Sequence, residues 1–123
     1  ITLSKLLNRK ITMLHSYKKY VKYRIKTPLP SYRQFPCVTP NFDNASRRMH
    51  KGFTAFIGST PQLYGKWLSS VFEKFKPYSQ EENFIFINAW NEWAEGNHLE
   101  PDQKWGRKYL EETKKNIDQY KNR

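Results

Sequence analysis

Apolar positions recur at helical spacing in the first quarter of the chain. The repeat consists of Leu3, Leu7, Ile11, Leu14, Tyr17, Val21 and Ile25. Thr27-Pro28 and Pro30 end this pattern, because proline has no amide hydrogen with which to continue a helix. We therefore predict an amphipathic helix that ends before Thr27.

Two more helices are predicted in the second half of the chain. Thr60-Pro61 is a good helix start, with Thr60 as the N-cap and Pro61 in the first helical position. The apolar positions that follow predict a helix that ends at Lys76-Pro77. A last helix is predicted from Trp105 to Tyr120. Its apolar side would hold Tyr109, Leu110, Thr113, Ile117 and Tyr120.

Two short apolar runs are predicted to be buried strands. The first runs from Phe35 to Thr39 between prolines, and the second from Phe84 to Ile87. The elements then follow in the order helix, strand, helix, strand, helix. Alternation of this kind is typical of the α/β fold class with a parallel sheet.

The charge is distributed very unevenly along a chain of net charge +11. Residues 1–33 contain nine Lys or Arg and no acid, so the outward face of the first helix should be strongly basic. We interpret this face as a solvated outer surface. No nucleic-acid partner is expected, since no RNA-binding signature accompanies the charge, and weak association with an anionic membrane surface through this helix remains open.

Acidic, aromatic and amide side chains follow the second predicted strand directly. Glu92 and Glu95 are the candidate catalytic pair, since glycosidic-bond chemistry uses two carboxyl groups. Tryptophans offer flat faces for sugar rings, and amides, imidazole and carboxylate can bind hydroxyl groups. The candidate substrate-binding residues here are Trp90, Asn91, Trp93, His98 and Glu100. The alternative is that the acids are solvated and the tryptophans belong to the core.

A second candidate site segment follows the first predicted strand. Asp43, Asn44 and Arg47 lie in the loop that leaves this strand, where they could bind a sugar hydroxyl or an anionic leaving group. Clusters of Asp and Asn are also ordinary turn and helix-cap residues, so a purely structural role is the alternative. No metal site is expected, because His50 and His98 have no further ligands in a suitable spacing.

Both segments resemble one family. Residues 84–110, with Asn88-Ala89-Trp90-Asn91-Glu92-Trp93-Ala94-Glu95-Gly96 and then Leu99-Glu100-Pro101-Asp102, are similar to the C-terminal motif of the WbsX-like glycosyltransferases. That family is related to the endo-α-mannosidases of glycoside hydrolase family ninety-nine. The block from Phe35 to Asn44 with Arg47, followed by Gly58-Ser59-Thr60-Pro61 and Trp67-Leu68, is similar to the preceding segment of the same family. The resemblance covers roughly residues 32–115.

The resemblance implies a fold and a chemistry. It implies that residues 1–123 form a single C-terminal fragment of a (β/α)8 barrel, without its first strands and helices. In the family-ninety-nine hydrolases the first glutamate of the motif is a base on the sugar 2-hydroxyl and the second is the general acid, which places these roles on Glu92 and Glu95. The hydrolases usually carry histidine where this chain has Ala94, so the WbsX-like branch fits better.

The expected function is glycosyl transfer in the biosynthesis of a cell-surface polysaccharide, such as O-antigen or capsule, on a glycan or sugar substrate. No metal and no cofactor are expected. An endo-acting glycoside hydrolase with the same glutamate pair is one alternative, and a catalytically silent carbohydrate-binding fragment is another. Cys37 is the single cysteine and can form no internal disulfide, and the chain from Ile1 shows no signal-peptide pattern, so a cytoplasmic location is expected.

Overall fold

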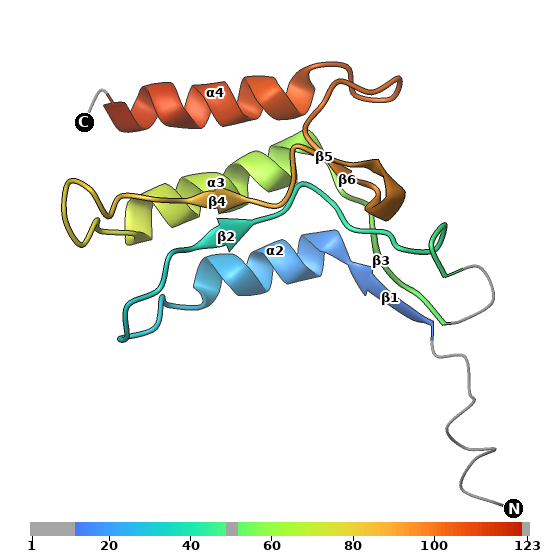
Figure 1. Cartoon of the computed structure of the whole chain (residues 1–123), viewed down its shortest axis with the longest axis horizontal. Helices are drawn as coiled ribbons and strands as arrows, with labels where there is room; N and C mark the ends of the chain where they lie inside the picture. The colour runs from blue at the N-terminus through green and yellow to red at the C-terminus, as the bar shows by residue number, and fades with distance from the viewer. Residues whose placement is uncertain (1–11, 49–51, 122–123) are drawn as a thin grey trace, which may run out of the picture.

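Three helices lie side by side in the order α2, α3, α4 (Figure 1). The computed structural model describes residues 12–48 and 52–121. The helices are α2 (Tyr17–Lys26), α3 (Pro61–Lys74) and α4 (Lys108–Lys121). Because α3 packs against both of the others, it is the central helix of the layer.

Helix α3 begins as its sequence predicts. The Thr60 side chain accepts a hydrogen bond from the Leu63 amide at 3.3 Å, and Pro61 occupies the first turn. Helix α4 begins at Lys108, later than the predicted Trp105. Its predicted apolar side is wrong at Ile117, which is 37% exposed, because the buried position in that turn belongs to Asn116.

The first predicted helix is wrong over Met13–Ser16, which form strand β1. Leu3, Leu7 and Ile11, also assigned to that helix, lie outside the described residues. Strand β1 pairs in parallel with β3 (Thr54–Ile57), a strand that the sequence pattern did not predict. The Ser16 hydroxyl then caps α2 by accepting the Lys19 amide at 3.4 Å. Pairing with β3 therefore overrides the helical spacing of this segment.

Strands β2 (Cys37–Val38) and β4 (Phe86–Ile87) form a parallel pair, as predicted, although each is shorter than the apolar run that contains it. In Figure 1 both strands run toward the end of the molecule at which all three helices begin. The loops that carry the candidate site residues leave the strands at this end. The α/β class is therefore confirmed.

The core lies between the helix layer and the β2–β4 pair. Its buried residues are Tyr17, Val21, Val38, Tyr64, Trp67, Leu68, Val71, Leu99 and Tyr109. The Tyr17 hydroxyl donates to the Thr39 carbonyl at 2.6 Å and so joins the start of α2 to the end of β2. The core thereby fixes the strand ends from which the site loops leave.

The other side of the β2–β4 pair is open. Cys37, which the sequence suggested as a buried residue, is exposed, and Phe84 and Phe86 are 50% and 55% exposed. The predicted burial of both strands therefore holds on one face only. None of the helices in the described part of the chain is long and apolar enough to cross a membrane.

Candidate functional site

The segment that contains Glu92 and Glu95 forms a hairpin after β4. Strands β5 (Asn91–Glu92) and β6 (Asn97–His98) pair in antiparallel register, and a 3₁₀ turn, η1 (Trp93–Glu95), makes the tip. Gly96 closes the turn with φ of 53°, a left-handed conformation that favours glycine. The hairpin places Glu92 on its first strand and Glu95 in its tip.

The loop that carries Asp43, Asn44 and Arg47 lies against the tip of this hairpin. The Asp43 amide donates to the Glu95 carbonyl at 2.6 Å, and the Ser46 hydroxyl donates to the Ala94 carbonyl at 2.8 Å. Arg47 Nη1 lies 2.7 Å from Glu95 Oε1. The structure therefore brings together two segments that the sequence predicted separately.

Asp43 and Asn44 use their side-chain oxygens within the loop itself. Asp43 Oδ1 accepts the Ala45 amide at 2.9 Å, and Asn44 Oδ1 accepts the Thr54 amide at 2.8 Å. The Asp43 bond is that of a turn residue, and the Asn44 bond holds the loop against β3. The geometry thus supports the structural alternative for Asp43 and Asn44, and their role in substrate binding stays a prediction.

The two candidate catalytic carboxylates have different surroundings. Glu92 is exposed, and within the described ranges its carboxylate has no hydrogen-bond or salt-bridge partner. Glu95 is 26% exposed and is paired with Arg47. Glu92 is therefore free to accept a proton from a ligand, whereas a proton-donating role for Glu95 requires the ion pair to open.

Both tryptophans of the motif offer surface to a ligand. Trp90 and Trp93 are 52% and 49% exposed, so the alternative that they belong to the core is wrong. One face of the Trp93 indole is stacked on His98, with ring centroids 3.6 Å apart and an angle of 13° between the planes. Its Nε1–H donates to Glu100 Oε2 at 2.5 Å. His98 and Glu100 thus hold Trp93 in place.

Asn97 has a structural role in the site that the sequence did not predict. It is fully buried, and its Oδ1 accepts the Ala89 amide and the Thr39 hydroxyl, each at 3.0 Å. These partners follow β4 and β2, so one side chain ties the hairpin to both strand ends. The Asn88–Ala89 peptide bond between β4 and the hairpin is cis. A lone Asn in a polar loop carries no periodic signal that could have revealed this role.

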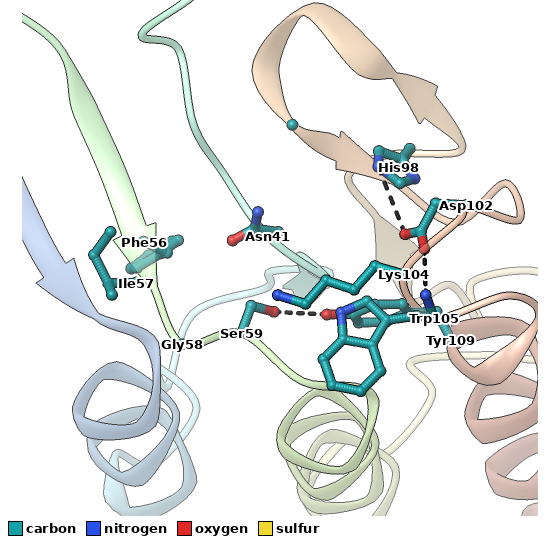
Figure 2. Close-up of a pocket in the computed structure, with 11 residues that line it drawn as sticks. Asn41, Phe56, Ile57, Gly58, Ser59, His98, Asp102, Lys104, Trp105 and Tyr109 are labelled. Atoms are coloured by element: carbon teal, nitrogen blue, oxygen red, sulfur yellow. Dashed lines mark hydrogen bonds and ion pairs between the residues drawn. The ribbon is translucent and has the colours of Figure 1, made fainter.

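A cavity of about 300 Å³ lies beside the hairpin, between the end of β3, the start of α3 and the loop before α4 (Figure 2). Of the sequence-predicted site residues it contains only His98, together with Gly96 next to Glu95. Ser59, Asp102 and Tyr109 also line it and were not predicted as site residues. Burial raises the pKa of Tyr109, so its phenol stays protonated across the neutral range.

Metal ligands do not gather here. Across residues 12–48 and 52–121 there is no group of three or more His, Cys, Asp or Glu side chains that could hold a metal ion. The chemistry that these residues can offer is that of carboxylates, amides and indoles.

The comparisons with known proteins identify one family. The profile of the family described as Glycosyltransferase WbsX matches residues 2–113. The chain belongs to the WbsX glycosyltransferase family. The match includes both motif segments, so the Arg47–Glu95 contact joins two parts of the family's sequence pattern.

Two curated relatives, both called Uncharacterized protein WxcX, come from two strains of Xanthomonas campestris pv. campestris. Each is 40% identical to the chain over 88 residues, a match that covers 71% of this chain and 12% of the relative. The chain therefore spans only a small part of the length of these relatives. No solved structure gives a significant match.

Proposed function

We propose that this WbsX-family protein is a glycan-processing enzyme that transfers a sugar during biosynthesis of a cell-surface polysaccharide. The observation that carries the proposal is the meeting of both family motifs at one strand end. There Arg47 contacts Glu95, Glu92 is free, and Trp90 and Trp93 are half exposed. Paired carboxylates beside exposed indoles are the groups that glycosidic-bond chemistry requires.

In the proposed mechanism, Glu92 removes the proton of the sugar 2-hydroxyl. The 2-oxygen attacks C1, and the departing oxygen receives a proton from Glu95. An acceptor hydroxyl then opens the anhydro sugar, losing its proton to Glu95 while Glu92 returns a proton to the 2-oxygen. The absence of a partner for Glu92 among the described residues supports its base role. Arg47 would leave Glu95 when substrate enters.

We also propose that the described elements are the C-terminal segment of a (β/α)8 barrel. The parallel β2–β4 pair, with helices on one side and the site loops at the strand ends, supports this arrangement. The open face with Cys37, Phe84 and Phe86 would then meet the other strands of the barrel. A reducing, cytoplasmic compartment fits the free thiol of Cys37.

The test is turnover by the natural full-length protein and its Glu92→Gln and Glu95→Gln variants. Labelled nucleotide-activated sugars and oligosaccharides serve as donors and acceptors. Each substitution keeps the side-chain shape and removes the titrating group, so turnover should fall about a hundredfold to ten-thousandfold while glycan binding remains. Glu95→Gln should spare the first step for donors with good leaving groups, whereas Glu92→Gln should slow that step for both kinds.

Glu81→Gln is the matched control, because Glu81 is an exposed acid between α3 and β4. Its turnover should equal that of the wild type. Wild-type turnover in both Glu92→Gln and Glu95→Gln would refute the catalytic assignment and leave this segment a carbohydrate-binding role, which the half-exposed Trp90 and Trp93 also support. Sugar transferred to water in preference to any acceptor would identify a hydrolase.

A further inference from the structure

The cavity beside the hairpin is rich in hydrogen-bond acceptors. Asn41 Oδ1 is buried, and no partner for it is found in the described part of the chain. Asn41 lies on the wall that faces the loop before α4 in Figure 2. A buried carbonyl oxygen without a partner loses hydration free energy, so a ligand that brings a donor to it would restore a favourable contact.

His98 and Asp102 supply two more acceptors. His98 Nδ1 lies 3.2 Å from the Glu100 carbonyl, which can only accept, so this nitrogen carries the hydrogen. In the neutral ring Nε2 then has a free lone pair, and it faces Asp102 Oδ2 at 4.0 Å. That distance is too long for a direct hydrogen bond. A hydroxyl group placed between His98 and Asp102 could donate to either of them.

Ser59 and Tyr109 add a hydroxyl pair to the cavity wall. The Ser59 hydroxyl donates to the Pro40 carbonyl, so it accepts from the Tyr109 hydroxyl at 2.8 Å. Because burial keeps Tyr109 protonated, its oxygen retains a lone pair for another donor. Among the described residues that line the cavity, Lys104 is the only lysine or arginine, and its Nζ lies 5.3 Å from the centre of the Trp105 ring.

From this arrangement we infer that the cavity is a subsite for a neutral sugar unit, held by donation of its hydroxyl groups to Asn41, His98, Asp102 and Tyr109. Rings with several hydroxyl groups match a cavity of about 300 Å³ with several acceptors, whereas a phosphate would meet the Asp102 carboxylate. Gly96 lines the cavity and follows Glu95, so this unit would lie next to the bond that Glu95 acts on. The choice of a sugar rests on the proposed function.

The test is nuclear magnetic resonance of the indole N–H groups in the natural full-length protein carrying Glu92→Gln, so that binding is measured without turnover. Trp105→Phe identifies the Trp105 signal. The probes are the methyl glycosides of glucose, galactose, mannose and N-acetylglucosamine. At least one should shift the Trp105 signal saturably, and Asn41→Ala and Tyr109→Phe should each weaken its binding by roughly tenfold or more.

Gln119→Ala is the control, since Gln119 lines a separate groove between α3 and α4, and it should leave binding unchanged. A Trp105 signal that none of the glycosides moves would overturn the subsite. So would a signal moved by inorganic phosphate or a nucleoside diphosphate and not by glycosides. Glycoside binding at Trp105 together with wild-type turnover of the Glu92 and Glu95 variants would refute the catalytic roles of the two glutamates and leave the subsite standing.

Discussion

Arg47 Nη1 contacts Glu95 Oε1 at 2.7 Å across 48 positions of the chain. The contact is flanked by two hydrogen bonds to hairpin carbonyls, from the Asp43 amide to Glu95 and from the Ser46 hydroxyl to Ala94. The arginine of one family motif is thus held against one of the two candidate catalytic carboxylates of the other. The coupling free energy of this ion pair can be measured separately from catalysis.

A double-mutant cycle with Arg47→Gln and Glu95→Gln should give a coupling free energy of about 0.2–1 kcal/mol in the free energy of unfolding. The Arg47 side chain is 55% exposed, and solvent screens such pairs. The coupling should shrink in high salt. The exposed Lys114–Asp118 pair of α4 is the matched control, and denaturant unfolding is the measurement. A coupling of several kcal/mol would contradict the screened pair described here.

Gly96→Ala should lower the free energy of unfolding by more than Gly106→Ala. Both glycines have left-handed φ angles, 53° and 56°, so each substitution should cost about 1–2 kcal/mol in strain. A Cβ at Gly96 would also meet the Asp43 Cβ at 3.2 Å, whereas one at Gly106 meets nothing within 4 Å. Thermal or denaturant unfolding of both variants measures the difference. Equal losses would show that the Asp43 loop yields freely.

Replacing Lys18, Lys19 and Lys22 together by Gln should leave turnover unchanged in the natural full-length protein. All three side chains are exposed on α2, away from the hairpin that carries the candidate carboxylates. Steady-state kinetics of the triple variant tests this. A loss of turnover with unchanged circular dichroism would give the basic face of α2 a part in the function, and weaker binding to anionic vesicles would identify it as a membrane contact.

Tyr64 should make the protein less stable in alkali. Burial raises the pKa of Tyr64 from 10.0 to about 12, with the Thr113 hydrogen bond opposing the shift. As the pH rises, the Tyr64 phenol therefore ionises at a lower pH in the unfolded chain than in the folded protein. The stabilising contribution is complete below pH 10 and is lost as the pH rises toward 12, a loss of about 3 kcal/mol.

Tyr64→Phe removes this titration, so its free energy of unfolding should fall less steeply above pH 10. Tyr23→Phe, at a side chain that is 62% exposed, should keep the wild-type slope. Denaturant unfolding at several alkaline pH values, with tyrosinate absorbance as a second probe, makes the comparison. Identical slopes for all three proteins would mean that Tyr64 ionises as freely in the fold as in the unfolded chain.

The sequence predicted well those features that depend on residues close together in the chain. Thr60 and Pro61 specify the start of α3 because capping and a fixed proline φ act within one turn. Strands β1 and β3 were not predicted, because they depend on contacts between residues far apart in the chain. Their residues pair across more than forty positions, from Met13 with Thr54 to Ser16 with Ile57, and helical spacing at Leu14 and Tyr17 cannot report such pairing.

The same distinction holds in the site. The composition around Glu92 and Glu95 indicated carbohydrate chemistry, but the contact of Arg47 with Glu95 depends on how the loop after β2 folds over the hairpin. Asn97 is the clearest case, because its importance comes from two partners, Thr39 and Ala89, that follow different strands. Tertiary hydrogen bonds of this kind leave no pattern in the residues around them.

The stacking of Trp93 on His98 has a stereochemical consequence. With one face of the indole covered at 3.6 Å and its N–H held by Glu100, a pyranose can approach Trp93 from one side only. The two faces of a pyranose differ in their pattern of C–H and O–H groups, and the C–H face is the one that suits an indole. A sugar bound here would therefore turn its C–H face toward the free side of Trp93 and its opposite face away from the indole.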